Sequence, residues 1–156
     1  MVGRIDKRLE ELGVTLPQAQ KPVVAKIKGA SIIGNTLYVS GMIPQWEGDV
    51  RYVGTVGREF TIEKGREAAR LSALNVLAQA RVALDGDLDR IKQIVKVSGF
   101  VKCTPDLTEV AAVVNGASEL FVEVFGERGE HARIAVGAAT MPLGVAVEIE
   151  AIMEIE

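Results

Sequence analysis

Residues 132–156 read ARIAVGAATMPLGVAVEIEAIMEIE, and this closing stretch decides the fold. From residue 145 onward apolar residues alternate with glutamates: Val145, Val147, Ile149, Ala151, Met153 and Ile155 against Glu148, Glu150, Glu154 and Glu156. Successive side chains of a strand point to opposite faces, so this period of two predicts a strand with one buried and one wet face. Residues 133–139 predict another strand, and Pro142 and Gly144 predict a turn between the two. We therefore expect a terminal β-hairpin.

Turn chemistry and hydrophobic periodicity together predict the rest of the chain. In chain order we expect a short helix (6–12), two strands (23–33 and 36–40) around Gly34-Asn35, a loop (44–56), a helix from Thr61 to Gly86, a strand (91–102) and a second long helix (107–126). No long linker or shift in composition interrupts this order, which predicts one α+β domain over residues 1–156, with residues 1–22 as an N-terminal extension. We expect a mixed sheet backed by two helices.

The predicted strand over residues 91–102 alternates between apolar residues and lysines, with Ile91, Val95, Val97 and Val101 on its expected buried face. The other face of the sheet is not purely polar, since Ile94, Phe100 and Ile152 are expected there. Apolar surface that the chain itself leaves uncovered marks contact sites in oligomers. We expect a partner subunit to cover part of this face.

Composition and charge argue against several classes of function. Eighteen basic and 21 acidic residues give a net charge of -3, and aromatic residues make up 4% of the chain, so we expect no nucleic-acid partner. Cys103 and His131 are single residues of their types, which rules out an intramolecular disulfide and predicts no metal site. The N-terminal charges and the lack of a long apolar run predict a cytoplasmic protein that does not bind a membrane.

Arg133 and Glu148 are the candidate functional residues of the closing stretch. An arginine fork binds a carboxylate through two parallel hydrogen bonds and does not deprotonate, which suits recognition of an α-keto, α-imino or α-amino acid. A buried glutamate with a raised pKa can move protons through a water molecule at neutral pH. The residues alone leave open a structural ion pair for Arg133 and simple solvent exposure for Glu148. His131 is expected to anchor a loop rather than to act in catalysis.

A series of motifs extends from about residue 24 to the end of the chain. It comprises Ile33-Gly34-Asn35, Leu37-Tyr38-Val39-Ser40-Gly41-Met42-Ile43-Pro44, Asn75, Gly86-Asp87-Leu88, Val95-Lys96-Val97, Val114-Asn115, Ala132-Arg133, Pro142 and Val147-Glu148-Ile149-Glu150-Ala151-Ile152. In order and spacing these motifs resemble the Rid (YjgF-like) family of imine deaminases, whose members are often labelled endoribonuclease L-PSP. The resemblance implies a chorismate-mutase-like fold and a homotrimer in which the sheets form a central barrel, with three clefts between neighbouring subunits.

The resemblance also implies an activity that needs no cofactor, and a role for each matching residue. In the deaminase branch an arginine grips the carboxylate of a 2-imino acid, and a glutamate holds the water that attacks the imine carbon. Ammonia and a 2-keto acid are released. By motif position these residues are Arg133 and Glu148. Ser40 and Gly41 match the cleft-lining residues after the second strand, and Asn115 matches the asparagine of the second helix.

Two positions depart from the deaminase pattern. Ala135 stands at a substrate-binding position where deaminases usually carry cysteine, and Ile27 falls near the place of a cleft tyrosine. These departures keep a second hypothesis open, a protein that binds a small carboxylate metabolite without turnover. An RNA-acting protein, which the endoribonuclease label suggests, ranks third because the acidic balance and sparse aromatic residues do not support RNA binding.

Overall fold

The computed structural model describes residues 1–23 and 25–156, and these form an α+β domain around a five-stranded sheet. The strands of this sheet are β1 (Ala30–Ile33), β2 (Thr36–Met42), β5 (Ile91–Lys102), β6 (Ala132–Ala138) and β7 (Val147–Ile155). Their order is β1-β2-β7-β5-β6, and all neighbours are antiparallel except β5 and β6, which run parallel. The predicted mixed sheet is confirmed. The strand predicted over residues 23–33 begins at Ala30, and residue 24 lies outside the described part.

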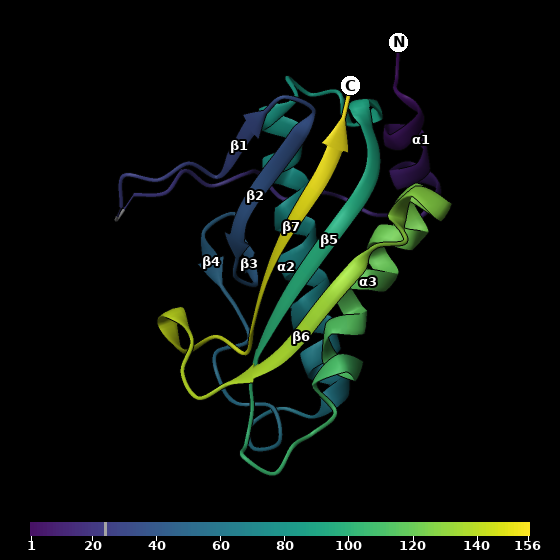
Figure 1. Cartoon of the computed structure of the whole chain (residues 1–156). Helices are drawn as coiled ribbons and strands as arrows, with labels where there is room; N and C mark the ends of the chain where they lie inside the picture. Colours follow the sequence, from purple (N-terminus) through teal and green to yellow (C-terminus); the bar gives the residue numbers. More distant parts are fainter. Residues whose placement is uncertain (24) are drawn as a thin grey trace.

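Two long helices cover one face of the sheet, as Figure 1 shows with the strands in front and the helices behind. They are α2 (Ile62–Ala83) and α3 (Val110–Phe125). The Thr61 hydroxyl accepts a hydrogen bond from the Lys64 amide at the start of α2, and Gly126, with φ 64°, ends α3. The two helices approach closely because α3 carries Gly116, where a Cβ atom would clash with the Arg66 carbonyl. Both predicted helices are confirmed, as is their position behind the sheet.

β6 and β7 do not form the predicted hairpin, because β5 lies between them. The segment that joins them, which includes the short helix η3 (Pro142–Gly144), crosses to the far side of β5 instead of turning back tightly. The parallel pairing of β5 with β6 is possible because α3 and the short helix η2 (Gly126–Gly129) carry the chain back to the starting end of β5. The alternating pattern therefore identifies both strands correctly but assigns them the wrong neighbours.

An irregularity in β5 changes which of its residues are buried. The pairing with β7 shifts between Ile94 and Lys96, as it does at a β-bulge. As a result Ile94 is fully buried in the core and Val95 is 42% exposed, the reverse of the prediction from strict alternation. Beyond the shift, Val97 and Val101 are buried as expected.

The N-terminal extension packs against the domain. It begins with α1 (Arg4–Glu11), whose Ile5 and Leu9 side chains are buried. The carboxylate of Asp89, in the short helix η1 (Leu88–Arg90), accepts hydrogen bonds from the backbone amides of Arg4 (2.7 Å) and Ile5 (2.8 Å) at the start of this helix. The predicted loop over residues 44–56 contains a small hairpin, β3 (Gln45–Trp46) with β4 (Asp49–Val50).

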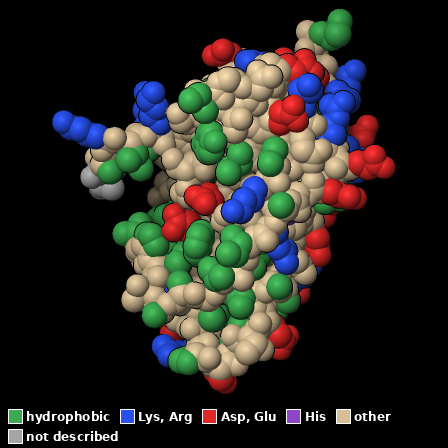
Figure 2. All heavy atoms as spheres, viewed as in Figure 1, with side chains coloured by type: hydrophobic (Ala, Val, Ile, Leu, Met, Phe, Trp, Pro, Cys, Tyr) green, Lys and Arg blue, Asp and Glu red, His purple; other side chains and the backbone are tan. Residues whose placement is uncertain are grey.

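The face of the sheet that points away from the helices is uncovered, and we call it the open face. Figure 2 shows hydrophobic side chains gathered on it around a few charged groups. Tyr38, Ile134 and Val136 are 46%, 48% and 37% exposed there. Phe100 and Ile152, predicted to lie on this face, do so, because Phe100 pairs with Glu148 and Val136, and Ile152 with Tyr38. Within the described residues no helix is long and apolar enough to cross a membrane.

Candidate functional site

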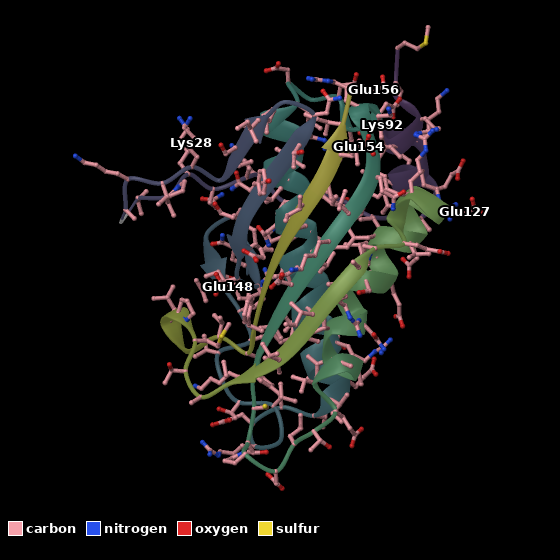
Figure 3. All side chains as sticks on the ribbon, in the orientation of Figure 1. Lys28, Lys92, Glu127, Glu148, Glu154 and Glu156 are labelled. Carbon is pink, nitrogen blue, oxygen red and sulfur yellow. The ribbon has the colours of Figure 1, made fainter. Side chains whose placement is uncertain are left out.

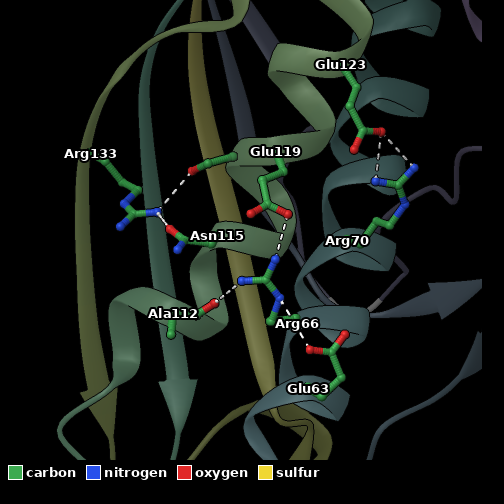
Figure 4. Close-up of polar contacts among 9 residues, drawn as sticks. Glu63, Arg66, Arg70, Ala112, Asn115, Glu119, Glu123 and Arg133 are labelled. Atoms are coloured by element: carbon green, nitrogen blue, oxygen red, sulfur yellow. Dashed lines mark hydrogen bonds and ion pairs between the residues drawn. The ribbon is translucent and has the colours of Figure 1, made fainter.

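Arg133 lies on β6, at the edge of the sheet beside α3. Its Nη1 group donates hydrogen bonds to the Asn115 side-chain oxygen (2.6 Å) and to the Ser118 hydroxyl (3.2 Å), as Figure 4 shows. Asn115 and Ser118 are three residues apart, so they lie on the same side of α3. Among the described residues Arg133 forms no ion pair, whereas the nearby Arg66 and Arg70 pair with glutamates. A structural salt bridge within the chain, the alternative role of Arg133, is therefore not supported.

Glu148 lies on β7 with its side chain on the open face (Figure 3). The carboxylate is half-buried, and in the described part of the chain it has neither a hydrogen-bond donor nor a cation as partner. Burial raises the pKa of Glu148 above its usual value, and the negative charge of Glu150 acts in the same direction. Phe100 is its cross-strand neighbour on β5. A glutamate in this state is a stronger base than an exposed one.

Gly41 makes room for the Glu148 carboxylate. A Cβ atom at residue 41 would clash with Oε1 of Glu148. The register between β2 and β7 shifts between Val39 and Met42, so Ser40 and Gly41 lie in a bulge, with Gly41 against the Glu148 side chain. The structure thus brings together two of the predicted site residues, Gly41 and Glu148.

Arg133 and Glu148 are not brought together within one chain. Arg133 is paired with Val97 of β5, and Val97 faces the helices together with its other partner, Ala151. Glu148 is paired with Phe100, three residues further along β5 and therefore on the opposite face. Two strand spacings and three residues of rise put their Cα atoms roughly 14 Å apart. The two residues therefore do not lie on neighbouring strands of a hairpin, which the sequence pattern predicted, because β5 separates β6 from β7.

The remaining predicted residues divide between the two faces. Asn115 joins Arg133, as described. Ser40 lies beside Gly41 in the bulge of β2, where its hydroxyl donates to the Lys28 carbonyl (2.6 Å). It also lines a hollow of about 440 Å³ on the open face, where Ile27 and Tyr38 contribute apolar surface. Ala135 follows Arg133 on the helix-facing side and packs against the core with a methyl group only.

The structure adds two residues that the sequence patterns did not single out together, Ser118 and His131. The Ser118 hydroxyl lies 2.8 Å from Nε2 of His131, and Nδ1 of His131 lies 2.5 Å from the Gly129 carbonyl. The predicted loop-anchoring hydrogen bond of His131 is confirmed by the contact with Gly129. Ser118 was missed, although its spacing of three from Asn115 is a signal that both lie on one helix face. No group of three or more potential metal ligands gathers among the described residues.

The open five-stranded sheet backed by two helices defines a small α+β domain, with Arg133 and Glu148 on opposite faces of its sheet. Residues 6–154 match the family described as "YjgF/chorismate mutase-like, putative endoribonuclease". The chain belongs to this family, which confirms the Rid-like resemblance and the chorismate-mutase-like fold. Protein TCP17 of Trypanosoma cruzi is 43% identical over 154 residues, which is 98% of this chain and 95% of that protein.

Solved structures with the same fold span nearly the whole chain. The crystal structure of the Agrobacterium tumefaciens protein Atu1372, of unknown function, is 46% identical with a TM-score of 0.90, covering 97% of this chain and 92% of the other. The E. coli protein TdcF, solved with bound serine, is 25% identical with a TM-score of 0.61, covering 90% of this chain and 94% of TdcF. The similarity to Atu1372 includes the N-terminal extension, because it covers 97% of this chain.

Proposed function

We propose that this protein hydrolyses reactive 2-imino or enamino acids to 2-keto acids and ammonia, without a cofactor, in a cleft between subunits. The observation that carries the proposal is the division of the site within one chain. Among the described residues, Arg133 keeps Nε and Nη2 free on one side of the sheet, and Glu148 presents an unpaired carboxylate on the other. Both groups can reach one small substrate only if a neighbouring copy supplies one of them.

The open face supports the assembly that this proposal needs. Its exposed apolar side chains include Tyr38, Ile134 and Val136, and burying them against other copies is favourable at about 25 cal/mol per Å² of apolar area. A homotrimer with the open faces inward would cover them and would bring the β6 edge of one copy to Glu148 of the next. The same arrangement closes each cleft from bulk water, which strengthens the electrostatic interactions inside it.

The proposed reaction uses Arg133 to bind the substrate and Glu148 to move protons. The guanidinium of Arg133 binds the carboxylate of the imino acid and orients its imine carbon. Glu148 takes a proton from a water molecule as the oxygen attacks that carbon, and the proton passes to the nitrogen. The hydroxyl group of the tetrahedral carbinolamine then loses its proton, which Glu148 passes to the nitrogen, and as the carbonyl forms the carbon–nitrogen bond breaks and ammonia leaves with a 2-keto acid. One water is consumed and no electrons are gained or lost, so no oxidant or metal is needed.

Three further observations support a small carboxylate as the ligand in a cytoplasmic setting. TdcF carries serine, an α-amino acid with the same carboxylate that Arg133 would bind. The net charge of -3 and the few aromatic residues favour a small anionic ligand less than a basic protein would, but they favour nucleic acid least, because its phosphates need a strongly basic surface. The lone Cys103 suits a reducing compartment.

A second candidate, a receptor that binds a carboxylate metabolite without turnover, is favoured by Ala135. This residue offers only a methyl group where deaminases usually place a thiol, and Ile27 adds no hydroxyl at the rim of the open-face hollow. The cleft would then lack polar groups that help to position the substrate nitrogen. Arg133 would bind its ligand in the same way in both candidates.

The deciding experiment measures release of ammonia and keto acid from 2-iminobutanoate, generated in place by an amino-acid oxidase. We expect the wild-type protein to accelerate release and Arg133→Ala to lose about 10²–10³-fold, as on removal of a key charge-stabilising donor. Arg133→Lys, which keeps the charge without the fork, should lose part of the rate. Because Arg133 is exposed, its variants should unfold at the wild-type temperature. No acceleration by the wild type with any imine would favour the receptor, and an unchanged Arg133→Ala would overturn the role of the arginine.

A further inference from the structure

A chain of hydrogen-bonded groups lies behind Arg133. It runs from the Gly129 carbonyl to Nδ1 of His131 (2.5 Å), from Nε2 of His131 to the Ser118 hydroxyl (2.8 Å), and from that hydroxyl to Nη1 of Arg133 (3.2 Å). Neither Ser118 nor His131 takes part in the chemistry proposed above. The chain therefore calls for an explanation of its own.

Only one arrangement of hydrogens satisfies every group of this hydrogen-bonded chain when His131 is neutral. The Gly129 carbonyl can only accept, so Nδ1 of His131 carries the hydrogen and Nε2 is an acceptor. The Ser118 hydroxyl must then donate to Nε2, which leaves its oxygen free to accept from Arg133. Burial lowers the pKa of His131 and the charge of Arg133 lowers it further, against an opposing contribution from the hydrogen bond to Gly129. The neutral form is thus favoured at physiological pH.

The His131 end of the hydrogen-bonded chain is held rigidly. The ring of His131 stands edge-on to Phe121 of α3, with the ring centres 6.0 Å apart and the planes at 89°. Phe121 itself is fully buried. Gly129 lies against the same helix, because a Cβ atom there would clash with the Phe121 backbone. The position of Ser118's hydrogen-bond partner is therefore set by the core.

At the Arg133 end of the hydrogen-bonded chain, Ser118 and Asn115 together determine which guanidinium nitrogens remain available to a ligand. Each Nη nitrogen of arginine carries two hydrogens, and both hydrogens of Nη1 are used by these two acceptors. One acceptor would let the guanidinium pivot, whereas two acceptors in different directions fix its plane. Within the described part of the chain Nε and Nη2 keep their hydrogens free, and these two groups form one of the two forks that match a carboxylate.

We propose that Ser118 and His131 are positioning residues, which hold the Arg133 guanidinium with its Nε and Nη2 edge available to the carboxylate of the substrate. This rests on the proposed function for the identity of the ligand, but the hydrogen-bonded chain is present without it. Ser118 acts on Arg133 directly, and His131 acts through Ser118 by directing its hydroxyl hydrogen away from the arginine.

The test compares Ser118→Ala and Ser118→Thr with the wild type. Loss of one hydrogen bond in Ser118→Ala should raise KM for 2-imino acids, and Kd for 2-ketobutanoate measured by calorimetry, about five- to tenfold, with kcat little changed. Ser118→Thr keeps the hydroxyl and should restore most of the affinity. A neutral imine without a carboxylate should be processed equally by all three proteins. Ser72→Ala, which removes a buried helix hydroxyl that has no hydrogen-bond partner among the described residues, is the matched control and should behave as wild type.

Nuclear magnetic resonance tests the chain independently of any activity. His131 is the single histidine, so its ring nitrogens give one set of signals. In the wild type these should report a neutral ring with the hydrogen on Nδ1, and the Arg133 guanidinium should rotate slowly, several-fold slower than in Ser118→Ala. A hydrogen on Nε2, or equally fast rotation in both proteins, overturns the positioning role even if deamination is observed. If no imine or keto acid is bound by the wild type, the proposed function fails, and slow rotation that depends on Ser118 would still support the positioning role.

The alternative to a positioning role is that Ser118 acts as a covalent nucleophile. A serine next to a histidine can act as a nucleophile when the histidine takes its proton. Treatment with a fluorophosphonate followed by mass spectrometry distinguishes the two, because a positioning serine stays unlabelled. Labelling of Ser118 would overturn the proposal.

Discussion

Arg133 and Glu148 project from opposite faces of the same sheet, separated by β5, although both lie in the last 24 residues of the chain. Each is left without a charged partner among the described residues, and each is next to a feature that suits a ligand. Arg133 has two side-chain acceptors that fix its plane, and Glu148 has the space above Gly41 and a raised pKa. Their separation makes the subunit arrangement the first matter to test.

Mixing two inactive variants should restore activity if the site is shared between copies. Arg133→Ala retains Glu148, and Glu148→Gln retains Arg133, so a cleft formed by one chain of each kind contains both groups. When the two variants are unfolded together and refolded in equal amounts, about a quarter of the clefts in a randomly mixed cyclic trimer should be intact. Deaminase assays on the mixture and on each variant alone check this. No recovery in a properly assembled mixture would place the site within single chains.

Glu148→Gln should lower the activity of the protein but raise its stability above the pKa of Glu148. Loss of the base should lower kcat by about 10²–10⁴-fold. A carboxyl group whose pKa is raised on folding stabilises the fold while it is protonated, and this contribution is lost as the pH rises through the folded pKa. Above that pKa the neutral glutamine should therefore raise the unfolding temperature.

The control for this stability effect is Glu154→Gln, an exposed glutamate on the same strand. Melting curves at several pH values should show stabilisation by Glu148→Gln alone, and the advantage should disappear below about pH 4, where glutamates are protonated in both states. A destabilised Glu148→Gln at neutral pH would mean that the carboxylate has a stabilising partner in the assembled protein.

Glu150→Gln should move the acid limb of the pH–rate profile. Glu148 must be ionised to accept a proton, so kcat/KM falls as the pH drops through its pKa. The charge of Glu150 raises the pKa of Glu148, and its removal should shift the midpoint of this limb to lower pH. Comparison with wild type on the same substrate cancels the ionisation of the substrate itself. An unmoved midpoint would show that another group controls the limb.

Gly41→Ala should inactivate the protein through Glu148. The added methyl group occupies the space of the carboxylate oxygen, so the side chain must move away from its present position. We expect a loss of one to two orders of magnitude in kcat with a modest fall in unfolding temperature, comparable to about 1–3 kcal/mol of overpacking. In the Glu148→Gln background the same substitution should cost little further activity, because interacting residues are not additive. Additive losses would argue for an independent effect on the β2 backbone.

Much of this fold follows from local patterns in the chain. The three- and four-residue spacing of apolar residues locates α2 and α3, with Thr61 and Gly126 at their boundaries, because these signals act within one turn of helix. The alternation of β7 predicts its buried residues without error, since every odd-numbered residue from Val147 to Ile155 is buried. Motif order further identified Arg133, Asn115, Gly41 and Glu148, two pairs that the structure keeps together.

Other features depend on contacts between distant segments, which no local pattern encodes. Strict alternation buries Val95 and exposes Ile94, but a shift against β7 reverses them. The position of Ser118 beside His131 depends on how α3 crosses the end of β6, which is settled by packing of the helix on the core. At Ile94 and Val95 a one-residue change of register alters the face of the sheet to which each side chain points.

By itself the sequence determined that this protein is an α+β domain of the YjgF/chorismate mutase-like family, and it singled out an arginine and a glutamate as candidate functional residues. Periodicity reflects burial of one face of each element, which is a local property of the chain. The tertiary structure alone decided that β5 separates the strands of these two residues and that Arg133 is oriented by Asn115 and Ser118. Strand order is set by the free energy of the whole core, so it becomes visible only when all elements are packed together.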